Sequence, residues 1–444
     1  MSSADWETHL DILGQQPLLG IYTQISLCYV VKDESSHPKI VEILKTGLER
    51  LATSFPWLAG QVVREGSVSK IKPFEHLPTL IVEDWRHDST MPSMDVLRQA
   101  RFPFRLLDES IIASRNTLPT PEEMSSPSPV LALQANFIAG GLVLTVLVQH
   151  QTMDMTGQGY VMHNLSKACR GEEFTEEELS VGNLERPSLV PLLDESYKPG
   201  PELDRQIIKD LAIPPDAQIS PPKSVWLYFS FPPSALATLK AKATETLPSG
   251  FVSTDDVLSA FVWQSISRAR APRLKSTDTA TFGRAIDVRQ ALGIPKTYLG
   301  LMQNMVYHTS NLQELVEIPL GVLASQFRSA LDADALAYST RSLTTFFDRS
   351  ADKTIVSFAA SIDPSKDFML SSWAKIDCYN FDFGLGLGKP ESVRRPQFTP
   401  VEGLGYLMPK RLDGEISLAI CLREEDMERL KGDQEFLKYG CCIE

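Results

Sequence analysis

Apolar residues near the start of the chain recur with two different periods. The stretch 21–31 is rich in β-branched and aromatic residues, a composition that favours a strand. Between residues 40 and 55 the apolar positions recur every three or four residues, which is the spacing of an amphipathic helix. The pattern therefore predicts a strand followed by a helix.

A second apolar segment predicts a hairpin. Residues 130–137 and 142–148 are largely apolar, and Gly140 and Gly141 lie between them. Two glycines between apolar runs favour a tight turn that joins two strands. The second predicted strand leads directly to His150, which therefore lies at a strand end.

The second half of the chain also alternates between strand and helix patterns. Ser253, followed by Thr254 and two aspartates, is typical of a helix N-terminus. The other predicted elements are a strand (281–288), helices (312–331), a hairpin (405–408 with 416–422) and a charged helix from Glu424. This alternation predicts a mixed α/β fold.

Chain length and proline content predict two lobes. The 444 residues exceed the roughly 250 to 300 at which a single core stops growing. Prolines recur among charged residues over 191–222, which is the composition of a semi-rigid connection. We therefore predict an N-terminal lobe (1–190) and a C-terminal lobe (223–444), with part of 380–405 packed on the N-terminal lobe.

Charge and composition exclude several classes of protein. The net charge of -13 disfavours binding to nucleic acid or anionic membranes, because the average field repels polyanions. No apolar run reaches the roughly 18 residues that a membrane-spanning helix needs, and the first residues lack the pattern of a secretory signal. The six cysteines include no Cys-x-x-Cys pair. We expect a cytoplasmic, monomeric protein with reduced cysteines and no bound metal.

His150 is the histidine whose surroundings best suit chemistry. It ends an apolar strand, Asp154 follows four residues later, and glycines come just beyond. An imidazole at the rim of a cleft suits proton transfer near neutral pH. A buried, purely structural histidine remains the alternative. A metal site formed with Asp154 and His163 lacks a further well-placed ligand.

Four motifs together resemble those of the BAHD acyltransferases. The sequences His-Gln-Thr-Met-Asp at 150–154 and Asp-Phe-Gly-Leu-Gly at 382–386 resemble the HXXXD and DFGWG motifs of that family, in the same order. Asp-Val-Arg at 287–289 and Ser-Ser-Trp at 371–373 resemble two further family elements. The resemblance covers the whole chain. It is strongest to a fungal branch that acetylates the C3 hydroxyl of trichothecene sesquiterpenoids.

The resemblance implies both a fold and a reaction. The fold would be two chloramphenicol-acetyltransferase-like lobes, each a mixed sheet with flanking helices, and an active-site tunnel between them. The expected reaction transfers acetyl from acetyl-CoA, a co-substrate and not a bound cofactor, to a terpenoid alcohol, in toxin self-protection or biosynthesis. His150 would be the general base. The Trp373 indole and the Ser371 hydroxyl would stabilise the oxyanion.

The family also implies supporting roles. Asp154 would point away from the substrate and pair with Arg289, which would hold the histidine turn in shape. Asp382 and Gly384 would shape a structural loop. The residues expected to contact CoA are Ser253, Ser371 and Ser372.

Two departures from the family pattern bear on these expectations. Leu385 replaces a tryptophan, as it does in the fungal branch. Gly250 stands where a cation for a CoA phosphate would be expected, so that the phosphate contacts remain open. The candidate substitutes are Lys240, Lys242, Lys389, Arg394 and Arg395.

Other functions fit parts of the pattern. A condensation domain of peptide assembly lines shares the two-lobed fold and a His-x-x-x-Asp motif. That family favours a second histidine before the motif and a glycine after it, whereas this chain has Gln149 and Met155. An acetyltransferase for another fungal secondary-metabolite alcohol and a non-catalytic terpenoid-binding protein are the remaining alternatives.

Overall fold

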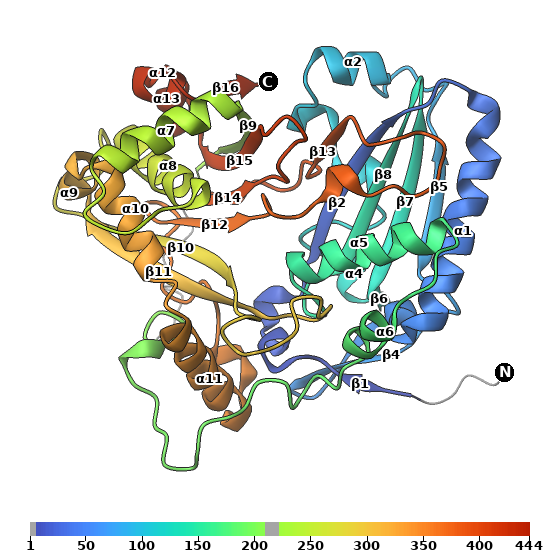
Figure 1. Cartoon of the computed structure of the whole chain (residues 1–444), viewed down its shortest axis with the longest axis horizontal. Helices are drawn as coiled ribbons and strands as arrows, with labels where there is room; N and C mark the ends of the chain where they lie inside the picture. Colours follow the sequence, from blue (N-terminus) through green and yellow to red (C-terminus); the bar gives the residue numbers. More distant parts are fainter. Residues whose placement is uncertain (1–5, 209–221) are drawn as a thin grey trace.

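The computed structural model describes residues 6–208 and 222–444. Figure 1 shows two lobes side by side, each with a mixed sheet and flanking helices, which agrees with the expected α/β fold class. The predicted connection 191–222 lies partly outside the described residues, and the division at that point stays a prediction. Within the described residues, none of the helices combines the length and apolar character needed to cross a membrane.

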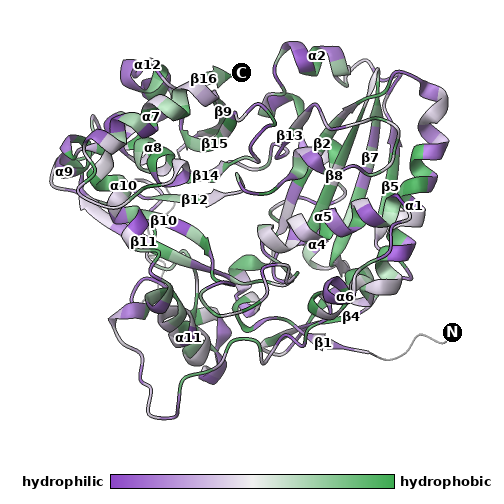
Figure 2. Cartoon of the chain, in the orientation of Figure 1, coloured by the Kyte–Doolittle hydropathy of each residue, from purple (hydrophilic) through white to green (hydrophobic). Residues whose placement is uncertain are grey.

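A five-stranded sheet forms the centre of one lobe, and its middle strand leads to His150. In spatial order its strands are β13 (Ser392–Arg394), β2 (Tyr22–Val30), β8 (Gly141–Gln149), β7 (Leu131–Ile138) and β5 (Thr79–Asp84). Every residue of β7 and β8 is buried, which explains why both strands are largely apolar (Figure 2). Helices α1 (His37–Ser54) and α5 (Met155–Cys169) contribute their apolar sides to the same core.

A seven-stranded sheet forms the centre of the other lobe. In spatial order its strands are β11 (Gln303–Asn311), β10 (Thr279–Asp287), β12 (Phe368–Ser372), β14 (Leu404–Leu407), β15 (Ile416–Arg423), β9 (Ser224–Phe231) and β16 (Cys441–Ile443). The helices that pack with this sheet in one core are α7 (Pro233–Glu245), α8 (Thr254–Arg270), α9 (Leu312–Glu317), α10 (Leu320–Ser329), α12 (Glu424–Gly432) and α13 (Gln434–Leu437). The capping box between Ser253 and Asp256 fixes where α8 begins.

The remaining elements lie around these two sheets. A small sheet contains β1 (Thr8–His9), β4 (Val68–Pro73), β3 (Gly60–Glu65) and β6 (Ser128–Pro129). The other helices are α2 (Met94–Gln99), α3 (Glu109–Ile112), α4 (Pro121–Met124), α6 (Glu176–Gly182) and α11 (Ala333–Arg349). In Figure 1, α11 lies below the seven-stranded sheet.

One late segment of the chain joins the two lobes. Strand β13 lies within 380–405 and pairs antiparallel with β2, with Arg394 opposite Ser26 and Ser392 opposite Cys28. The chain then returns to the seven-stranded sheet as β14. A strand from the C-terminal part of the sequence is therefore hydrogen-bonded to the sheet that carries His150.

Candidate active site

His150 follows the last residue of β8 in a tight turn. Its backbone N–H donates to the carbonyl oxygen of Ile21 at 2.8 Å, which continues the pairing with β2. Its ring atom Nδ1 lies 3.0 Å from the carbonyl oxygen of Met153. A carbonyl only accepts, so Nδ1 carries the proton and Nε2 keeps its lone pair. The side chain is half-buried, and its free nitrogen has the protonation state of a base.

The turn that follows His150 is held by buried polar groups. The Thr152 hydroxyl donates to the carbonyl oxygen of Gln149 at 2.7 Å. The Arg186 guanidinium donates to the Thr152 carbonyl oxygen at 2.8 Å and forms an ion pair with Asp11 at 2.9 Å. Asp11 also accepts a hydrogen bond from Tyr298. Neither Asp11 nor Arg186 is marked by any local sequence pattern, and sequence analysis missed both.

Asp154 turns away from His150 and forms a two-pronged ion pair with Arg289. Its two oxygens lie 2.9 and 3.0 Å from the guanidinium nitrogens, and both side chains are buried. The carboxylate also accepts from the backbone N–H of Gly157 and of Met302, at 2.8 and 2.7 Å. With its oxygens thus occupied, Asp154 serves as the N-cap of α5 and as an anchor between the lobes.

Gly157 makes this close approach possible. A Cβ atom at position 157 would lie 2.2 Å from the carbonyl oxygen of Leu299, a distance that no real side chain tolerates. The first turn of α5 therefore rests directly on the loop that follows β10. Arg289 donates to carbonyl oxygens of the same loop, at Tyr298 and Gly300.

Burial lowers the pKa of His150 below its ordinary value of 6.5. Its hydrogen bond to Met153 and the charge of Asp154 oppose this shift, and the positive charge of Arg395 adds to it. The net direction is downward, so the imidazole is uncharged at neutral pH.

Ser371 and Trp373 lie together at the end of β12. The Trp373 indole N–H donates to the Ser371 hydroxyl oxygen at 3.0 Å, and the ring is almost wholly buried against Tyr406. The Ser371 oxygen accepts this bond, so its own O–H remains available as a donor. In this arrangement the indole N–H is already used, and the hydroxyl is the donor that is free.

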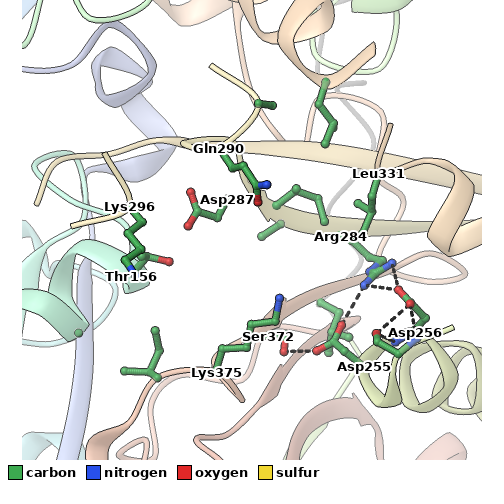
Figure 3. Close-up of a pocket in the computed structure, with 18 of the residues that line it drawn as sticks. Thr156, Asp255, Asp256, Arg284, Asp287, Gln290, Lys296, Leu331, Ser372 and Lys375 are labelled. Atoms are coloured by element: carbon green, nitrogen blue, oxygen red, sulfur yellow. Dashed lines mark hydrogen bonds and ion pairs between the residues drawn. The ribbon is translucent and has the colours of Figure 1, made fainter. Parts of the chain in front are cut away.

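A cavity of about 690 Å³ opens between α5 and the seven-stranded sheet (Figure 3). Thr156 lies at one end of it, close to Asp154 in sequence, and Asp287 and Gln290 project into it from above. Ser253 and Ser372 also line it. Two of the three serines expected to contact CoA thus face one cavity, whereas Ser371 is not among its lining residues.

The far end of this cavity holds a cluster of charged residues. Arg284 pairs with Asp255 at 2.9 Å and with Asp256 at 3.3 Å, and Arg328 also pairs with Asp256. The Ser372 hydroxyl donates to Asp255 (Figure 3). The charges of Arg284 and Arg328 are therefore largely balanced by Asp255 and Asp256.

Two further cations of the cavity wall were missed by sequence analysis. Lys296 and Lys375 line the cavity, are exposed, and have no ion-pair partner within the described residues. The five substitutes proposed from sequence lie elsewhere: none of Lys240, Lys242, Lys389, Arg394 and Arg395 lines the cavity. Lys242 pairs with Glu435, and Arg394 and Arg395 are buried. Lysines on separate loops carry no signal in a single sequence.

The other predicted site residues lie apart from His150. The Asp382 carboxylate accepts from the Gly384 N–H at 2.8 Å, and Gly384 has a positive φ of 67°, which favours glycine. Arg170 donates to the Asp382 carbonyl oxygen. Arg170 follows the last turn of α5, about 24 Å along the helix from Asp154. Among the described residues, no group of three or more His, Cys, Asp or Glu is arranged to hold a metal ion.

Known proteins match this chain over its whole length. Residues 21–169 match the Trichothecene 3-O-acetyltransferase-like N-terminal domain, and residues 110–437 match the Transferase family. O-acetyltransferase dmxR13 from Cryptosporiopsis sp. (strain 8999) is 54% identical over 450 residues, which cover 99% of this chain and 98% of the relative. Trichothecene 3-O-acetyltransferase TRI101 from Fusarium sporotrichioides is 53% identical over 450 residues, with the same coverage.

The solved structures agree. The crystal structure of F. graminearum TRI101 complexed with Coenzyme A and Deoxynivalenol has a TM-score of 0.95 and 48% identity to this chain, and covers 99% of this chain and 100% of that one. Whole-chain similarity to O-acetyltransferases decides against the condensation-domain alternative. The chain therefore belongs to the Transferase family, the BAHD-type acyltransferases that its motifs resemble, and its N-terminal part is a trichothecene 3-O-acetyltransferase-like domain.

Proposed function

We propose that this acyltransferase transfers the acetyl group of acetyl-CoA to the C3 hydroxyl of a trichothecene sesquiterpenoid. The observation that carries the proposal is His150, uncharged and with Nε2 free, in a turn that the Asp154–Arg289 pair holds in shape. Thr156, two residues beyond Asp154, lines the large cavity between the lobes. Similarity to TRI101, crystallised with Coenzyme A and Deoxynivalenol, supports both substrates.

In the proposed mechanism, His150 acts as the general base. Nε2 removes the proton of the acceptor hydroxyl as the hydroxyl oxygen attacks the thioester carbonyl carbon. General-base catalysis of this kind typically raises the rate roughly 100- to 10,000-fold. The tetrahedral intermediate then expels the CoA thiolate, and the thiolate takes the proton from the imidazolium. The Ser371 hydroxyl donates to the oxyanion, and the Trp373 indole orients that hydroxyl.

No acyl-enzyme is needed in this mechanism. Burial raises the pKa of Cys28, Cys169 and Cys421 to about 12, so that these thiols stay protonated at neutral pH. Ser371 is the hydroxyl that could form such an intermediate instead. We expect intersecting initial-rate plots for the two substrates and an unchanged intact mass with acetyl-CoA alone. Acetyl trapped on Ser371 would refute direct transfer.

The pH dependence of the reaction should follow His150. Because burial lowers its pKa, kcat/KM is expected to rise with pH, with an apparent pKa below 6.5, and to level off by neutral pH. The loss at low pH reflects protonation of Nε2, which removes the base. The measurement is kcat/KM between about pH 5 and 8, with circular dichroism at each pH as the control for folding. A flat profile across the acid range would contradict a histidine base.

We place the CoA moiety in the cavity lined by Ser253 and Ser372, with Lys296 and Lys375 as the cations nearest its phosphates. Each lysine changed to alanine should raise the KM for acetyl-CoA about three- to tenfold and leave kcat nearly unchanged, because a single phosphate contact is lost. Lys389→Ala is the matched control, since Lys389 is an exposed lysine outside the cavity that donates to Asn380. If Lys296→Ala and Lys375→Ala combined in one protein left the KM for acetyl-CoA unchanged, the CoA phosphates would lie elsewhere.

The acceptor is the least constrained part of the proposal. The 54% identity to dmxR13 supports another fungal secondary-metabolite alcohol as the alternative acceptor. The test incubates the protein with acetyl-CoA, a thiol reagent and a panel of terpenoid alcohols, beginning with trichothecenes that have a free C3 hydroxyl. Matched trichothecenes with a blocked C3 hydroxyl are the control. CoA release with both members of a pair would rule out C3, and binding without release would indicate a non-catalytic protein.

We further propose that the protein acts as a monomer in the cytoplasm. All six cysteines are free thiols, which suits a reducing compartment. Each proposed site residue comes from the same chain, so that one copy supplies the whole site. Gel filtration at working concentration tests the oligomeric state.

A further inference from the structure

Phe251 is an aromatic side chain that remains largely in solvent. It is 69% exposed, whereas the adjacent Val252 is buried. Two residues later comes Ser253, the N-cap of α8, which lines the cavity of Figure 3. Single exposed apolar residues are common on protein surfaces. What distinguishes Phe251 is its place beside a large cavity and the partner that it has there.

Arg328 connects the Phe251 ring to that cavity. Its guanidinium carbon lies 5.0 Å from the centre of the ring, and Arg328 is itself a lining residue of the cavity. The same guanidinium donates to Asp256, which fixes its position. The contact with Phe251 is therefore that of a cation held over an aromatic face. Because Arg328 covers one face and the residue is 69% exposed, the other face of the ring is open to a planar ligand.

The cavity wall near this pair is partly apolar and partly cationic. The segment that follows Arg328 contributes three lining residues, Leu331, Ala333 and Leu336. Arg284 adds a second guanidinium, which pairs with Asp255 and Asp256. Aromatic rings and guanidinium planes are the groups on which nucleobases stack, because every base has a π face. This end of the cavity therefore suits the base of a nucleotide.

The direction of the cavity decides which part of acetyl-CoA meets Phe251. Thr156, which lies near the His150 turn in sequence, is at the opposite end of the cavity from Asp256 (Figure 3). The thioester has to reach His150, and the adenosine is the end of CoA farthest from the sulfur. A donor whose thioester lies at the Thr156 end therefore has its adenosine near Arg328 and Phe251.

We propose that Phe251, held by Arg328, is the platform on which the adenine of acetyl-CoA stacks, and that this platform selects free CoA thioesters over pantetheine thioesters that lack the nucleotide. The inference rests on the proposed function and extends it to the recognition of the donor. The residue before the ring is Gly250 and not a cation, so stacking instead of charge supplies the contact at this point. The adenine lies far from the reacting carbonyl, so its contact contributes to donor binding and not to the chemical step.

Truncating the donor tests the platform directly. The measurement compares acetyl-CoA with S-acetylpantetheine, which has the same thioester and no nucleotide, at a saturating concentration of acceptor. Phe251→Ala is expected to lower kcat/KM for acetyl-CoA about tenfold through KM and to leave kcat/KM for S-acetylpantetheine unchanged, because only the first donor has a base to stack. Phe251→Trp should keep the native preference. An equal loss with both donors would contradict the platform.

Tyr338→Ala is the matched control for Phe251→Ala. Tyr338 lies on α11, is 50% exposed, and is not a lining residue of the cavity. Both substitutions remove a largely exposed aromatic ring, so neither should prevent folding. Tyr338→Ala should leave kcat/KM unchanged with both donors. A loss for acetyl-CoA in Tyr338→Ala as large as that in Phe251→Ala would show that the effect is not specific to the platform, and would overturn the inference.

Calorimetry with adenosine 3′,5′-bisphosphate, the nucleotide end of CoA, provides a measurement that needs no turnover. This nucleotide should bind the native protein and Phe251→Trp with similar affinity, and Phe251→Ala about tenfold more weakly. Equal affinity for the native protein and for Phe251→Ala, or no binding to either, overturns the inference. Failure of the proposed function is distinguishable, because it would appear as nucleotide binding that depends on Phe251 without acceptor-dependent release of CoA.

Discussion

His150→Ala is expected to lower turnover at least about a hundredfold while the protein folds and still binds acetyl-CoA. The alanine removes Nε2, the only atom assigned to take the acceptor proton. It also removes the bond from Nδ1 to the Met153 carbonyl oxygen, but the turn keeps its bonds through Thr152 and Asp154. Steady-state kinetics at saturating acetyl-CoA, with calorimetric binding of CoA, measure the two effects separately.

His163→Ala is the matched control for that variant. His163 lies on α5, lines the cavity of Figure 3 and is partly exposed, and the mechanism gives it no role in proton transfer. Its replacement should change kcat less than about threefold. Near-normal turnover in His150→Ala would contradict the proposed mechanism, whatever the result for His163→Ala.

Asp154→Ala is expected to destabilise the protein by about 3 to 5 kcal/mol and to abolish most activity. The substitution leaves Arg289 buried at 1% exposure without its two-pronged partner, and it leaves the N–H groups of Gly157 and Met302 unpaired. Denaturant unfolding measures the loss. Part of the stability should return in Asp154→Ala combined with Arg289→Met, because the uncompensated charge is then removed as well.

Asp287→Ala separates the two carboxylates that pair with Arg289. Asp287 lies 3.0 Å from the same guanidinium, but its side chain is 43% exposed, so its loss should cost no more than about 1 kcal/mol. If Asp154→Ala kept full stability and lost only rate, Asp154 would belong to the reacting groups and not to the support of the turn.

The strands around His150 could be predicted because they bury both faces. Apolar runs end where β7 and β8 end, and the position of His150 after β8 follows from that pattern. The contact between Asp154 and Arg289, which are 135 residues apart, was expected only from the resemblance to a family. No periodicity within the chain indicates such a pair.

The remainder of the site depends on contacts that sequence does not reveal. Arg186 reaches the Thr152 carbonyl oxygen from a loop, and Lys296 and Lys375 line one cavity only after folding. The indole of Trp373 was expected to serve as a free donor, but its N–H is bonded to Ser371. A side chain that is distant in sequence but contacts the 150–154 motif can be identified only from the folded structure, because its position along the chain has no fixed spacing from the motif.

The pairing of β13 with β2 has a consequence for synthesis of the chain. Ser392 and Arg394 emerge from the ribosome after nearly nine-tenths of the protein, yet they complete the sheet that was begun at Tyr22. Until then β2 is an edge strand with unpaired backbone groups, which is a template for association with other nascent chains. A chain that ends anywhere before residue 392 is therefore expected to be an aggregation-prone fragment and not an independently folded N-terminal lobe.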